Sequence, residues 1–165
     1  MKNRSINMLI VALLLLAALS VTLITFLTKA KEDFPKEIRV NADGETETIL
    51  AVRDLKLHPS ESKRYDVDLI CAASGSYYIS LDYEEKTNGG MKPFVDVTVM
   101  CGDVVVYRGN LAALLDADVQ IQFLGELHEK EPLPISVIYE MPRETGNEAQ
   151  RTSAEFDICL KIKKA

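Results

Sequence analysis

The chain has 165 residues, enough for one domain and a short appendage. Three of its 19 basic residues and none of its 25 acidic residues lie in 1–30, so residues 31–165 carry a formal charge of −9. A body this acidic repels phosphate groups, which argues against DNA or RNA as a partner.

The N-terminal part of the chain has the composition of an export segment. Residues 8–27 are uniformly apolar except for one serine and two threonines, and twenty helical residues span about 30 Å, the hydrocarbon thickness of a bilayer. Lys2 and Arg4 precede this run, which places the N-terminus in the cytoplasm. Residues 1–30 are therefore either a signal-anchor transmembrane helix, contacting the membrane through 8–27, or a signal peptide cleaved after 28–30. Both alternatives export the domain, to the outer side of the cell membrane or into the medium.

Beyond the export segment, apolar and polar residues alternate with the period of two that is typical of β-strands. Residues 31–41 are expected to be a juxtamembrane linker or a first strand, and 42–165 an extracytoplasmic domain. The pattern predicts an all-β jelly roll or β-sandwich of about eight or nine short strands. The predicted strands are 37–41, 46–52, 64–71, 76–84, 94–100, 103–107, 119–125, 133–140 and 154–163.

One interruption of the alternation predicts a short helix. Asn110 occupies an N-cap position and is followed by good helix formers up to Asp116. The alternative is that this segment continues a strand. The inward-facing set predicted from the alternation is Val67, Leu69, Ile79, Leu81, Val95, Val97, Val99, Val104, Val106, Ile121, Phe123, Ile135, Val137, Tyr139, Phe156, Ile158 and Leu160.

The three cysteines are an odd number, and their positions argue against a disulfide framework. Cys71 shares the parity of inward-facing residues in its strand, whereas Cys159 shares the parity of outward-facing ones. Side chains on opposite faces of strands cannot be bridged, so we expect no disulfide between these two cysteines.

The sequence carries no recognisable catalytic, cofactor-binding or metal-binding signature. His58 and His128 both lie in polar segments, and residues 128–131 begin like the zinc-protease motif HExxH. Pro132 stands where the second histidine is needed, so the zinc grip is absent. We therefore expect no catalytic residues, no cofactor and no metal, and a protein that is not an enzyme.

The C-terminal half contains a strand, tyrosine, glycine and short-helix segment at 104–115, a penultimate strand at 134–142 and a Gly-Asn-x-x-Gln loop at 146–150. Their resemblance is to the camelysin and TasA family of Gram-positive envelope and biofilm-matrix proteins. It implies a secreted jelly-roll domain that forms fibres or associates with fibre-forming partners, one subunit's N-terminal strand completing the next subunit's sheet. The export segment is longer than is usual in that family, and its cleavage site is poorer. The family-like residues are Tyr107, Gly109, Leu111, Gly146, Asn147 and Gln150.

Sheet edges give the assembly hypothesis its own physical basis, since their unpaired backbone groups can take up another extended segment. Residues 34–41 offer Phe34, Ile38 and Val40 as pocket-filling side chains, unless this segment forms the first strand of its own domain. The hypothesis is a non-enzymatic, secreted or membrane-anchored structural protein that assembles into, or supports, fibres of the extracellular matrix. It would do so by self-association or by contact with another envelope protein. The alternative is a membrane-anchored binding domain for another envelope protein or a polysaccharide.

Overall fold

The computed structural model describes residues 34–116 and 119–165. The chain divides into two units, Met1–Asp33 and Phe34–Ala165, and the described residues belong to the second. The predicted export helix 1–30, with its membrane contact at 8–27, lies outside the described residues. Within the described part, no helix combines the length and apolar character needed to cross a membrane.

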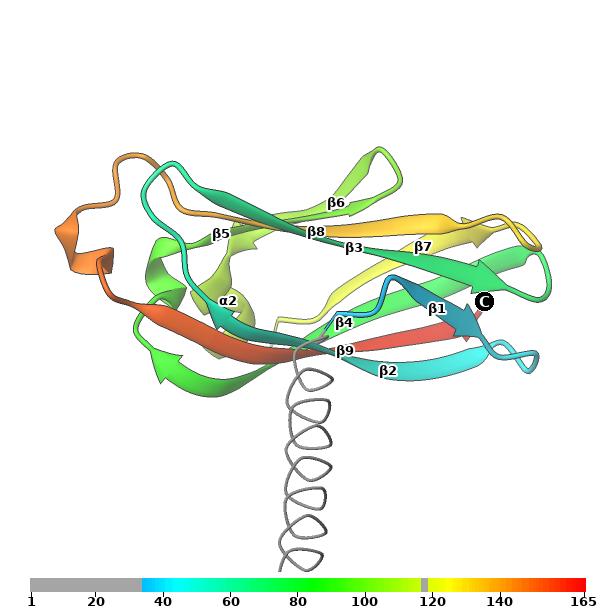
Figure 1. Ribbon diagram of the computed structural model, residues 1–165. Coiled ribbons are helices and arrows are strands. Elements are labelled where there is room, and N and C mark those ends of the chain that lie inside the picture. Colours follow the sequence, from blue (N-terminus) through cyan, green and yellow to red (C-terminus); the bar gives the residue numbers. More distant parts are fainter. Residues whose placement is uncertain (1–33, 117–118) are drawn as a thin grey trace, which may run out of the picture. The chain divides into compact units, whose positions relative to one another are not determined.

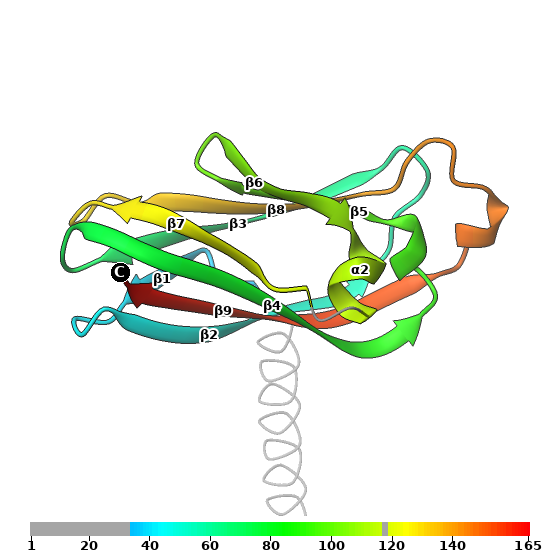
Figure 2. The same ribbon diagram turned by 180° about the vertical axis from the view of Figure 1, so that it is seen from behind.

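The described residues form a β-sandwich of two sheets, which Figures 1 and 2 show as two layers from opposite sides. In the five-stranded sheet the order is β1 (Glu37–Val40), β3 (Ser62–Cys71), β8 (Leu133–Glu140), β5 (Asp96–Cys101) and β6 (Val104–Asn110). In the four-stranded sheet it is β2 (Glu45–Leu55), β9 (Ser153–Lys164), β4 (Gly75–Gly89) and β7 (Ile121–Leu127). The predicted all-β sandwich is confirmed.

The predicted short helix is also present, as α2 (Leu111–Asp116). The Asn110 side chain caps it, because its Oδ1 accepts a hydrogen bond from the Ala112 N–H at 2.9 Å. Leu111 and Leu114 are buried, so the helix contributes to the core. Two 3₁₀ turns, η1 (Lys92–Phe94) and η2 (Asn147–Ala149), complete the described elements.

The core between the sheets follows the predicted alternation, with one clear exception. The predicted inward residues are buried apart from Val106 and Phe123, which are partly buried against the core, and Val104, which is 65% exposed. Val104 pairs with Cys101, which packs against the core, so it has the predicted facing, but it lies beside the β5–β6 turn on the edge strand of the sheet and stays exposed there. The pairing of β5 with β6 shifts between Val99 and Met100, so a single alternation does not run through β6, and Tyr107 rather than Val106 pairs with the buried Val99.

The cysteines have the predicted orientations, and all three are free. Cys71 is buried between the sheets, whereas Cys159 is partly exposed on the outer face of β9. The four-stranded sheet thus lies between these two thiols.

Candidate functional site

The N-terminal segment of the described chain docks on the edge of its own five-stranded sheet. β1 pairs in parallel with β3, in a register that places Glu37 beside Asp68 and Val40 beside Cys71. Ile38 and Val40 point into the core and are 7% and 4% exposed. The segment therefore forms a strand of its own domain, which was the alternative to a free assembly segment.

Aromatic contacts connect the start of this segment to the core. The Phe34 ring centroid lies 4.9 Å from that of Tyr65, and the Tyr65 ring lies 5.8 Å from that of Tyr139. Tyr139 in turn meets Phe156 of the opposite sheet at 5.4 Å. Such ring pairs each add about 0.5–1.5 kcal/mol beyond area burial, so Phe34 is held by packing just before β1 begins.

β1 covers only part of the β3 edge. β3 has ten residues, but the four residues of β1 pair only with Asp68–Cys71. The Asp68 N–H donates to the Lys36 carbonyl at 2.9 Å, so it faces the β1 side. Because backbone groups of alternate strand residues point the same way, those of Arg64 and Asp66 also face this side. In the described part of the chain, no strand lies beside them.

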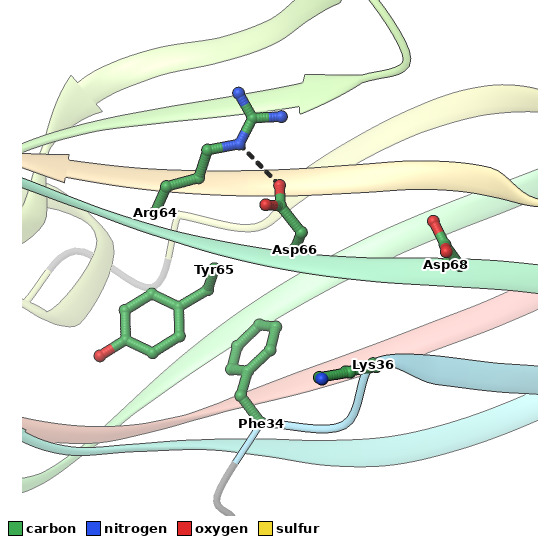
Figure 3. A pocket seen from close by; sticks show the side chains of 6 residues that line it. All are labelled: Phe34, Lys36, Arg64, Tyr65, Asp66 and Asp68. Atoms are coloured by element: carbon green, nitrogen blue, oxygen red, sulfur yellow. Dashed lines mark hydrogen bonds and ion pairs between the residues drawn. The ribbon is translucent and has the colours of Figure 1, made fainter.

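The side chains around this open edge form a hollow of about 430 Å³. Figure 3 shows it, with the Phe34 and Tyr65 rings close together and the Arg64 guanidinium directed at Asp66. The mixture of two rings with two cationic and two acidic side chains suits a segment of polypeptide better than one small apolar ligand. The lining residues are Phe34, Lys36, Arg64, Tyr65, Asp66 and Asp68.

A buried hydroxyl holds the charged side of this hollow in place. The Ser136 hydroxyl of β8 donates to Asp66 Oδ1 at 2.6 Å and accepts from Arg64 Nη2 at 2.8 Å, while Arg64 Nε lies 2.7 Å from the same carboxylate. The hydrogen bonds from Ser136 and Arg64 hold the pKa of the Asp66 carboxyl below its ordinary value. The carboxylate is therefore a fixed negative charge at neutral pH.

The histidines do not share a site. His58 lies just before β3 and His128 lies beside the other end of that strand, where Glu129 pairs with Cys71. At about 3.3 Å per residue, the ten residues of β3 separate them by roughly 30 Å. Within residues 34–116 and 119–165, no cluster of histidine, cysteine and acidic side chains could hold a metal ion.

The family-like residues occupy two different connections. Tyr107 lies on β6 with its hydroxyl over the Cα of Gly109, and Leu111 opens α2. Gly146, Asn147 and Gln150 lie between β8 and β9, where the Gln150 amide donates to Asn147 Oδ1 at 2.8 Å.

The fold and its partly open edge define a two-sheet β-sandwich with a docked N-terminal strand. No protein-family model matches the chain, and no curated protein is similar to it at a significant level. Among solved structures it is similar to PliG of Aeromonas hydrophila, a periplasmic inhibitor of g-type lysozyme, at 11% identity over 78% of this chain and 96% of that one, with a TM-score of 0.37. It is also similar to a family 35 carbohydrate-binding module from Clostridium thermocellum, at 11% identity over 72% and 92% with the same TM-score. Likenesses this distant assign no activity to the chain.

Proposed function

We propose that this chain is a non-enzymatic envelope protein that builds or supports extracellular fibres through the β1–β3 edge of its five-stranded sheet. The observation that carries the proposal is the half of β3 beside which residues 34–116 and 119–165 place no strand. An extended segment from a second copy adds there by backbone hydrogen bonding. The apolar run at 8–27 supports an external location, with the domain either released or held at the membrane.

The docked strand illustrates what this edge accepts. Ile38 and Val40 fill the core from an edge strand only four residues long, and the preceding Phe34 packs on Tyr65. A contact of this kind is head-to-tail, so its repetition from copy to copy gives an open chain of subunits. The resemblance to the camelysin and TasA family is in keeping with this mode of assembly.

The experiment compares two substitutions at one position of the open edge. Asp66→Pro removes the N–H that faces the edge but leaves the β3–β8 ladder intact, because that N–H points away from β8. Asp66→Ala removes the same carboxylate and keeps the N–H. Two differently tagged full-length copies are co-expressed, and the fraction of the second copy recovered with the first is measured.

We expect wild-type and Asp66→Ala copies to be recovered together, and Asp66→Pro to lower recovery about tenfold, the equivalent of about 1.4 kcal/mol. Circular dichroism verifies that both variants are folded. Wild-type protein that remains monomeric at every concentration would refute the proposal, and so would equal recovery of the proline and alanine variants.

A further inference from the structure

The outer face of the four-stranded sheet has a second hollow, of about 380 Å³, to which all four strands contribute. Four neighbouring strands span about 14 Å at the usual strand spacing. Tyr78 of β4 stands in this hollow with half of its surface exposed. In the register of the sheet, Lys163 of β9 lies on one side of Tyr78 and Leu124 of β7 on the other.

Side-chain contacts connect several of the residues that line this hollow to their neighbours. Asp82 accepts a hydrogen bond from the Gln120 amide at 2.7 Å and pairs with Lys161 at 3.3 Å. The Cys159 thiol donates to the Glu47 carboxylate at 3.1 Å. These contacts connect β2, β9, β4 and the residue before β7, so they hold the lining side chains in position.

Other polar groups in the hollow are left available for a ligand. The hydroxyls of Tyr78 and Ser80, the Gln122 amide and the Lys163 ammonium have no side-chain partner among the described residues. They include donors and groups that both donate and accept. A neighbouring carboxylate, Glu45, adds an acceptor. These polar groups are therefore suited to a ligand rich in hydroxyl groups, which both donate and accept hydrogen bonds.

A sugar chain has these properties. Its hydroxyls donate and accept hydrogen bonds, and the C–H face of a sugar ring packs on an exposed aromatic ring, where Tyr78 offers both an apolar face and a polar end. A pocket of a few hundred Å³ with a few convergent polar groups is typical of ligand sites. The hollow contains charges of both signs, and residues 31–165 carry a formal charge of −9, so a polyanionic glycan is repelled.

We propose that this outer face binds a neutral polysaccharide, with the Tyr78 ring against one sugar ring and Ser80, Gln122 and Lys163 on its hydroxyls. The site lies on the sheet opposite to the β1–β3 edge, so it is independent of assembly through that edge. An envelope protein with both features would connect a protein fibre to a glycan.

The experiment is native electrophoresis of the full-length chain, in a detergent without a sugar headgroup, through gels that contain a soluble glycan. The neutral probes are hydroxyethyl cellulose, dextran and galactomannan, and the anionic probe is polygalacturonate. The test variants are Tyr78→Ala and Gln122→Ala. Ile49→Ala is the matched control, since Ile49 is an apolar residue, 62% exposed, on the outer face of the same sheet but outside the hollow.

We expect at least one neutral glycan to retard the wild-type chain, with an affinity that Tyr78→Ala lowers about tenfold or more. Ile49→Ala should migrate like the wild type, and mobility in gels without glycan verifies that each variant is intact. Retardation by no neutral glycan, by polygalacturonate alone, or equally with and without the Tyr78 ring would overturn the proposal.

Discussion

Asp157 is a largely buried carboxylate on the outer face of the four-stranded sheet, and two cations hold it. It lies on the central strand β9, and its side chain is only 14% exposed. Its carboxylate oxygens lie 2.6 Å from Arg53 Nη2 of β2 and 3.3 Å from Lys86 Nζ of β4. Partial burial alone would raise the pKa of Asp157, but the two cations outweigh it and hold the pKa below its ordinary value.

This geometry predicts how one substitution changes stability with pH. A carboxyl with a lowered folded-state pKa adds stability above its unfolded pKa of about 3.9, and this stability is lost as the pH falls through the folded value. Asp157→Asn should lower the free energy of unfolding by about 1–3 kcal/mol at pH 7. Urea unfolding at pH 7 and pH 3 measures this, and the difference from wild type should narrow at pH 3.

Glu84→Gln is the control for this prediction. The Glu84 side chain is 72% exposed, and its Oε1 lies 2.7 Å from Nζ of the same Lys86 that contacts Asp157. Exposed ion pairs contribute about 0–1 kcal/mol, so its loss should be small. A Glu84 variant as unstable as the Asp157 variant would contradict the importance given to burial.

Among single residues, the burial of the polar Ser136 side chain could not be predicted from the sequence. The alternation at 65–71 correctly placed Cys71 inward, but the alternation at 133–140, with Ile135 and Val137 inward, gave no indication that Ser136 is buried at 1% exposure. Ser136 lies on a central strand, where its hydroxyl is covered by Arg64 and Asp66 from the neighbouring strand. That burial arises from a cross-strand pair distant in sequence, so no local pattern predicts it.

At the scale of elements, the turn at Gly44 connects β1 of the five-stranded sheet to β2 of the four-stranded sheet. Gly44 has a φ of +79°, donates to the Asn41 carbonyl at 2.9 Å and accepts from the Lys164 N–H at 2.8 Å. An added Cβ at Gly44 would lie 2.8 Å from the Cβ of Lys164. Both the backbone conformation and the space thus require glycine.

Gly102 provides a matched comparison for this turn. It also has a positive φ, of +57°, but no atom lies within 4 Å of an added Cβ. Gly102→Ala should cost about 1 kcal/mol for the left-handed conformation. Gly44→Ala should cost about 1–3 kcal/mol more because of the close contact. Urea unfolding measures both, and hydrogen exchange should show faster opening of β1 in the Gly44 variant. Equal losses would contradict this account.

Strand boundaries were predicted well where proline residues mark them. β8 was predicted as 133–140 and spans Leu133–Glu140, between Pro132 and Pro142. β4 was predicted to end at 84 but continues to Gly89, because the charged residues after Tyr83 still pair with β9 across an irregularity. Charged residues in succession resemble a loop until the partner strand is known.

At the scale of the whole molecule, the sandwich keeps its thiols apart. Cys71 is inside and Cys159 outside, so a layer of backbone separates them. Burial, followed by the Glu47 carboxylate, raises the pKa of the Cys159 thiol to about 11. The thiol therefore stays protonated at neutral pH and reacts slowly with oxidants.

We expect the full-length chain to contain three reduced cysteines even when it is isolated under oxidising conditions. Alkylation after unfolding without reductant, followed by intact mass measurement, should show three modifications. The same chain treated first with reductant is the control and should give the same mass. A pair of thiols protected from alkylation would contradict the separation seen in the fold.

The sequence by itself determined the class of fold, the capped helix at α2 and the facing of Cys71 and Cys159. These features follow from local rules, since side-chain period and capping depend on residues a few positions apart. Only the tertiary structure decided that β1 belongs to its own domain, that no described strand covers half of β3, and that Tyr78 stands beside Lys163 in a polar hollow. Each of these depends on which strands become neighbours, and neighbours are selected by burial of the whole core, to which every strand contributes.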